Sequence, residues 1–237
     1  SPLRPSLLEI YFTVLGFLRI CEIYGRNYAT CYESEPENAR VKLFCINPSV
    51  QLGASMNRCR TAVFFSATLR PMDYYRTMFG LEPTGVQLTL PSPFPSGNFG
   101  VFISNRISTY YHQREDSLPQ VIDAVRSLVS GHNGNYLLFF PSYPYMLQAH
   151  QAFTSVCPDL TTIIQVPEMS EADRRAFLQR FDAENRETLV GFAVMGGIFG
   201  EGIDLVGERL SGAAVVGVGL PGISLERELI RAHFDRY

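Results

Sequence analysis

Residues 189–204 read LVGFAVMGGIFGEGID, an apolar run that opens into a glycine-rich loop. The apolar run predicts a strand, and ligands of α/β sheets bind in the loops at the carboxyl ends of such strands. Four glycines in seven positions follow Met195, and glycine lets the backbone approach a ligand closely or adopt positive φ. No Gly-Lys-Ser/Thr sequence follows, so this loop is not a Walker A phosphate cradle.

Two acidic residues, Glu201 and Asp204, stand at the end of this loop. Their carboxylates would repel a triphosphate, but they can accept hydrogen bonds from sugar hydroxyls, from water or from an arginine. The alternative interpretation is a strained glycine turn with two solvated acids. Glycine content alone does not separate the two interpretations.

The second half of the chain alternates between predicted strands and predicted helices. Such alternation predicts an α/β fold with an open, mostly parallel sheet and helices on both faces. The apolar pattern places strands at 99–103, 136–140, 161–166, 189–195 and 213–218, and helices at 118–129, 145–153, 171–181 and 225–234. The helix at 171–181 resembles a solvated helix with an apolar stripe, and we assign it no catalytic role.

The first part of the chain is less regular. Its apolar pattern predicts a helix within 7–20, a strand at 41–46 and a short helix from Pro71 to Gly80. Residues 61–65 are wholly apolar, which predicts a strand buried on both faces of a parallel sheet. Residues 85–100 are rich in proline, serine and glycine and predict an interdomain linker. We therefore expect two domains, residues 1–84 and 85–237.

Two further polar loops follow apolar strands. Ser66, Ala67 and Thr68 come directly after residues 61–65, and small hydroxylated residues there can relay hydrogen bonds between a nucleotide site and a neighbouring lobe. Ser142 and Tyr143 follow the strand at 136–140, where they can donate to a phosphate and the tyrosine can stack on a base. The alternatives are that each serine caps the next helix and that Tyr143 packs on the surface.

A short basic and aromatic segment precedes that strand. Arg106 and Arg114 flank Tyr110, Tyr111 and His112, and basic residues interleaved with aromatic ones suit single-stranded nucleic acid. The alternative is an ordinary solvated loop. The net charge of −3 gives no global footprint for nucleic acid, so DNA contacts would rest on local groups of this kind.

Composition limits the class of protein. Of 237 residues, 46% are hydrophobic, which is enough to bury α/β cores. The five cysteines form no CxxC pair and no histidines stand at zinc-finger spacing, so we expect no metal site and a reduced, cytoplasmic compartment. The apolar stretch at 7–20 carries Glu9 and Arg19 and is too short to cross a bilayer, so we expect no membrane contact.

In their order along the chain, these segments resemble the XPD and DinG group of superfamily two DNA helicases. Residues 66–69 (SATL) resemble helicase motif III, residues 139–143 (FFPSY) resemble motif IV, and residues 196–204 (GGIFGEGID) resemble motif V. Residues 215–221 (VVGVGLP) are similar to the segment that follows motif V in this group. The resemblance covers residues 41–237, and motif V is its most specific part.

The resemblance implies a RecA-like fold and an ATP-dependent helicase that uses Mg²⁺, moves 5′ to 3′ along single-stranded DNA and serves DNA repair. Two RecA-like lobes clamp ATP in this group, so the chain's partner would be the first motor lobe of its own polypeptide. Nucleotide binding and coupling would involve Ser66, Ala67, Thr68, Glu201, Gly202 and Asp204. DNA binding would involve Ser142, Tyr143, Gly196 and Gly197, together with Arg106 and Arg114. We expect the loops from the three motifs to line one cleft.

The sequence departs from the full pattern of the group. It has no Walker A sequence, no Asp-Glu-x-His box, no cysteine cluster for an iron–sulfur centre, and no Gln-x-x-Gly-Arg-x-x-Arg of motif VI. The resemblance therefore implies a fragment, in which the end of the first lobe is joined to a second lobe truncated before its last motif. An iron–sulfur cluster would be held by a segment outside this chain. Because phosphoryl transfer needs lysine, Mg²⁺ and arginine around the terminal phosphate, we expect the chain alone to be inactive.

Two other functions are compatible with parts of this pattern. One is a motor-derived module that has lost catalysis and only binds DNA or a protein. The other is an unrelated α/β transferase lobe whose glycine loop meets a nucleotide sugar. The transferase interpretation predicts no match to helicase motifs, in their order along the chain, at Ser66 or Phe139.

Overall fold

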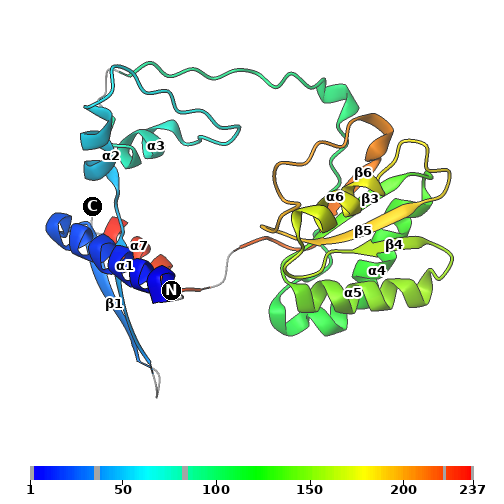
Figure 1. Cartoon of the computed structure of the whole chain (residues 1–237). Helices are drawn as coiled ribbons and strands as arrows, with labels where there is room; N and C mark the ends of the chain where they lie inside the picture. Colours follow the sequence, from blue (N-terminus) through cyan, green and yellow to red (C-terminus); the bar gives the residue numbers. More distant parts are fainter. Residues whose placement is uncertain (1–2, 35–37, 82–84, 221–222, 236–237) are drawn as a thin grey trace. The chain divides into compact units, whose positions relative to one another are not determined.

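The computed structural model describes residues 3–34, 38–81, 85–220 and 223–235. The chain folds into two compact units (Figure 1). One is formed by Ser1–Pro95 together with Gly222–Tyr237, and the other by Ser96–Pro221. The break at Pro95 falls within the proline-rich segment at 85–100.

The second unit is built on a four-stranded sheet in the order β4-β5-β3-β6, with every neighbouring pair parallel. Its strands are β3 (Asn135–Phe140), β4 (Thr161–Ile164), β5 (Leu189–Val194) and β6 (Gly212–Val215). The register pairs Asn135 with Leu189 and Phe140 with Val194, so the two central strands end side by side. The predicted parallel sheet is confirmed.

Helices cover both faces of this sheet (Figure 1). Successive side chains of a strand point to opposite faces, so Leu138 and Phe140 pack on one side with helices α4 (Arg114–Ser130) and α5 (Tyr143–Val156). Leu137 packs on the other side with α6 (Glu171–Gln179). Strand β5 is buried along its whole length, as expected for a central parallel strand between two helical layers.

The first unit contains helices and a hairpin. Its elements are α1 (Leu3–Ile23), the antiparallel strands β1 (Tyr28–Ser34) and β2 (Ala39–Cys45), and the helices α2 (Ser49–Met56), α3 (Met72–Met78) and α7 (Leu225–Phe234). A salt bridge of 2.8 Å from Lys42 to Glu226 links β2 to α7. The described residues also include the 3₁₀ turns η1 (Ser96–Asn98), η2 (Tyr111–Gln113) and η3 (Gly207–Arg209), which belong to the second unit.

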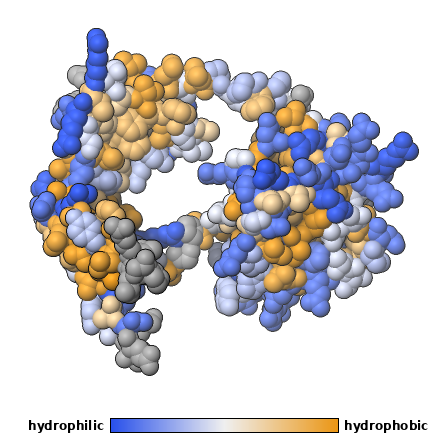
Figure 2. Space-filling view, viewed as in Figure 1, coloured by the Kyte–Doolittle hydropathy of each residue, from blue (hydrophilic) through white to orange (hydrophobic). Residues whose placement is uncertain are grey.

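Apolar side chains lie at the surface of the first unit (Figure 2). Helix α1 exposes more than half of Leu7, Ile10 and Phe12. The helix expected at 7–20 is therefore present and longer than predicted, and much of its apolar surface is uncovered among the described residues.

Two predicted strands are wrong. Residues 61–65 were expected to be buried, but they are irregular, and Val63 and Phe65 are 82% and 89% exposed. Residues 99–103 are irregular as well, with Phe102 93% exposed. A strand requires a neighbour for its backbone groups, and within the described part of the chain no strand pairs with either segment. Phe64 is less exposed, at 39%, and stacks on Phe79 with the ring centroids 4.3 Å apart.

Candidate functional site

The polar loops of the second unit gather at the carboxyl edge of its sheet. Ser142 follows β3, Gln165 follows β4, and Gly196 follows β5. Because β4, β5 and β3 are parallel neighbours, these three loops lie beside one another. The structure thereby brings together the predicted residues of motifs IV and V.

Gln165 joins the three strand ends. The residue is 2% exposed, its Nε2 donates to the Tyr143 hydroxyl at 2.8 Å, and its Oε1 accepts from the Val194 backbone N–H at 2.9 Å. Sequence analysis missed this residue. The predicted strand at 161–166 included this residue, whereas β4 ends at Ile164 and Gln165 follows it directly.

The glycine-rich loop needs glycine at specific positions. Gly196 and Gly202 have φ of 71° and 69°, a region that other residues rarely adopt. At Gly197 a Cβ would lie 3.0 Å from Gln165 Nε2 and 3.1 Å from the Val194 carbonyl oxygen. The loop is thus a folded structure with close backbone contacts.

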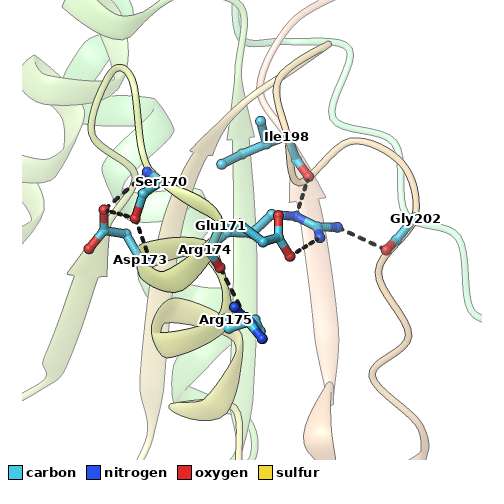
Figure 3. Close-up of polar contacts among 7 residues, drawn as sticks. All are labelled: Ser170, Glu171, Asp173, Arg174, Arg175, Ile198 and Gly202. Atoms are coloured by element: carbon cyan, nitrogen blue, oxygen red, sulfur yellow. Dashed lines mark hydrogen bonds and ion pairs between the residues drawn. The ribbon is translucent and has the colours of Figure 1, made fainter.

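Helix α6 supports this loop. Phe199, in the middle of the loop, is buried and stacks on Phe177 of α6 at 4.3 Å. Arg174 of α6 donates to the backbone oxygens of Ile198 at 3.3 Å and Gly202 at 2.9 Å (Figure 3). The helix that received no catalytic role therefore has a supporting role that the sequence did not reveal.

A second arginine, Arg209, makes a hydrogen bond to the carboxyl end of the same loop. Arg209 Nε donates to the Phe181 carbonyl at 2.9 Å and its Nη2 to the Leu178 carbonyl at 3.2 Å, at and just beyond the carboxyl end of α6. Its Nη1 reaches the Asp204 carbonyl at 3.4 Å. The loop backbone is therefore held at both ends, while Glu201 and Asp204 are exposed residues. Their carboxylates can accept hydrogen bonds from a ribose, from water or from an arginine.

Ser142 and Tyr143 differ in how their hydroxyl groups are used. Ser142 occupies the N-cap position of α5, but its side chain makes no capping hydrogen bond. The capping alternative for Ser142 therefore fails. The Tyr143 hydroxyl accepts from Gln165 and still has its own proton to donate.

The basic and aromatic segment also packs against this unit. The Arg114 guanidinium lies 4.8 Å from the Tyr145 ring and 5.4 Å from the Tyr111 ring, and its Nε donates to the Thr109 carbonyl at 3.2 Å. Arg114 is thus half-buried and has structural partners, whereas Arg106 is exposed. Burial is the main cause that raises the pKa of Tyr145 above its ordinary value.

The motif III residues Ser66, Ala67 and Thr68 belong to the other compact unit and are exposed. Ser66 Oγ accepts from the Thr68 backbone N–H at 3.1 Å, which closes a local turn. The helix that follows begins after Pro71, so Ser66 does not cap it.

Among the described residues, no group of three histidine, cysteine or acidic side chains could hold a metal ion. The cysteines are dispersed, with Cys21 and Cys59 exposed and Cys31 buried. In the same part of the chain, no helix is both long and apolar enough to span a bilayer.

A four-stranded parallel sheet between helical layers, with a supported glycine loop at its carboxyl edge, is the architecture of a RecA-like helicase lobe. Residues 125–237 match the family described as helicase C-terminal domain. The predicted RecA-like fold and the predicted XPD/DinG-type C-terminal region of a superfamily two helicase are confirmed. This match does not favour a module that has lost catalysis.

Two curated relatives are named general transcription and DNA repair factor IIH helicase subunit XPD. The relative from Schizosaccharomyces pombe is 24% identical over 98% of this chain and 33% of its own length. The relative from Dictyostelium discoideum is 26% identical over 98% of this chain and 32% of its own length. A solved structure titled XPD helicase has a TM-score of 0.59 and 17% identity over 94% of this chain and 39% of its own, a likeness that concerns the fold alone. The chain spans about a third of the length of the curated relatives it matches.

Proposed function

We propose that the protein carrying this chain is an ATP-dependent DNA helicase that moves 5′ to 3′ along single-stranded DNA. In this proposal residues 1–84 end the first motor lobe and residues 85–237 form most of the second. The observation that carries the proposal is the polar edge where Ser142, Gln165 and Gly196 meet, in a region that matches a helicase family.

The two sides of this edge would have different ligands. The DNA backbone would contact Ser142, Tyr143, Gly196 and Gly197, together with Arg106 and Arg114. Exposed acids suit a ribose or a water near Mg²⁺ better than the phosphates themselves, so Glu201, Gly202 and Asp204 would face the nucleotide. Ser66, Ala67 and Thr68 would couple the first lobe to the nucleotide.

The remaining parts of the motor would come from the rest of the polypeptide. ATP and Mg²⁺ would bind between this chain and the first motor lobe, and an iron–sulfur cluster would lie outside this chain. We infer a cytoplasmic protein of DNA repair. The 237-residue chain alone would show no DNA-stimulated ATP hydrolysis, because it has neither the Walker A sequence with its lysine nor the arginines of motif VI.

The test of the proposed function is the substitution of the loop acids in the full-length protein. We expect Glu201→Gln or Asp204→Asn to reduce DNA-stimulated ATP hydrolysis and unwinding by about a hundredfold, because each acid would act on the reacting nucleotide. The measurement is the unwinding rate of a duplex with a 5′ single-stranded tail. Unfolding midpoints should stay near wild type, since both residues are exposed.

The matched control is Glu208→Gln, which changes an exposed acid in η3 outside the glycine-rich loop. This variant should unwind like wild type. Normal unwinding by both loop variants, or unwinding from a 3′ tail only, would contradict the proposed function.

A further inference from the structure

We propose that Arg174 of α6 is a positioning residue for the glycine-rich loop, which it holds in the shape that directs Glu201 toward the nucleotide. This inference rests on the proposed function of the loop. It assigns a role to a residue that lies 24 positions before the nearer of its two loop partners, Ile198, and outside all three motifs.

The first observation is that one guanidinium spans the loop (Figure 3). Arg174 Nε donates to the Ile198 oxygen at 3.3 Å, and its Nη2 donates to the Gly202 oxygen at 2.9 Å. The two acceptors stand on either side of the segment that contains Glu201. Because both are backbone oxygens, the arginine fixes the path of the chain whatever side chains the loop carries.

The second observation concerns how Arg174 itself is held. Its Nη1 lies 3.4 Å from Glu171 Oε1, one helical turn earlier, and its side chain is 22% exposed. Charged donors make stronger hydrogen bonds than neutral ones. The planar fork of arginine can serve two acceptors in a fixed geometry, whereas the lysine ammonium is a compact charge on a flexible stem.

The third observation is that the loop would remain attached without Arg174. Phe199 is buried against Phe177, and Arg209 reaches the Asp204 carbonyl from the other side. Loss of Arg174 would therefore release the stretch around Glu201 while leaving the fold intact. This separates a positioning role from a role in stability.

The neighbouring residue Arg175 provides a matched control. It lies on the same helix, is exposed, and its Nε donates to the Glu171 carbonyl of its own helix at 3.3 Å (Figure 3). Within the described part of the chain Arg175 makes no hydrogen bond to the loop, so Arg175→Lys changes the same chemical group with no effect on the path of the loop.

The experiment compares Arg174→Lys, Arg174→Ala and Arg175→Lys with wild type in the full-length protein. The first readout is amide hydrogen exchange of residues 196–204, where Gly200 N–H is bonded to the Gly197 oxygen at 2.9 Å. Both Arg174 variants should exchange about tenfold faster in this segment, because a released loop opens more often. Arg175→Lys should match wild type.

The second readout is DNA-stimulated ATP hydrolysis. The Arg174 variants should lose about tenfold in kcat with little change in KM for ATP, because a displaced acid acts in the transition state more than in binding. Their unfolding midpoints should remain close to wild type.

Each outcome decides a different claim. Unchanged exchange in both Arg174 variants would overturn the loop-holding role, and faster exchange with unchanged kcat would overturn the positioning role. A wild-type protein without DNA-stimulated hydrolysis would instead overturn the proposed function, and the exchange readout would still decide whether Arg174 holds the loop.

Discussion

Gln165 shows how much of the site depends on one side chain. Its amide bridges the Tyr143 hydroxyl and the Val194 N–H, so the loops after β3 and β5 are held through the residue that follows β4. The close approach of Gly197 to the same amide adds a third constraint. A buried amide with both ends bonded orders its surroundings more than an exposed one.

We predict that Gln165→Ala lowers the free energy of unfolding by about 1–3 kcal/mol, because the buried Val194 N–H loses its partner. Urea titration of the purified chain provides the measurement. The exposed residue Gln148 on α5 supplies the control, and Gln148→Ala should change stability by less than about 0.5 kcal/mol. Equal effects of the two substitutions would show that Gln165 does not connect the strand ends.

The site residues that were predicted form a local sequence pattern, whereas those that were missed do not. Gly196, Glu201 and Asp204 form a compact pattern after a strand, so their grouping could be predicted. Gln165 and Arg174 are single polar residues whose partners are 22 to 29 positions away. Their roles arise from tertiary packing, which no local spacing encodes.

At the scale of elements, the central strands were predictable because their apolar sequences indicate burial. β3 and β5 are apolar and are followed or preceded by helices that cover both faces, as the alternation indicated. Residues 61–65 have the same apolar character, yet they form no strand. Periodicity measures the apolar character of a segment but not the presence of a pairing neighbour.

The burial of His150 on α5 makes stability depend on pH. His150 Nε2 lies 2.9 Å from Thr162 Oγ1, and the ring packs edge-on against Phe192. Burial lowers the pKa of His150 below its ordinary value of 6.5. The unfolded chain therefore takes up a proton at a higher pH than the folded chain does.

We predict that the free energy of unfolding falls as pH decreases through 6.5 toward the folded pKa of His150. The comparison is wild type against His150→Gln, which cannot titrate, in urea titrations at a series of pH values. The stability difference between the two proteins should change across this range. A constant difference would mean that the folded and unfolded pKa values of His150 are the same.

At the scale of the whole molecule, the chain divides into a unit built on the four-stranded sheet and a unit with exposed apolar surface. Val63, Phe65 and Leu7 are large apolar residues of that unit that lie uncovered among the described residues. The functional proposal depends mainly on the unit Ser96–Pro221, where the strand ends and the glycine-rich loop meet.

The most direct test asks which edge of the four-stranded sheet meets DNA. A photo-crosslinking amino acid would replace Ile198 at the carboxyl edge or Arg186, an exposed residue before β5 at the opposite edge. In the full-length protein, position 198 should crosslink to a single-stranded oligonucleotide at least about tenfold more than position 186, because only one edge carries the binding groups. Equal crosslinking, or a stronger signal from position 186, would contradict the account.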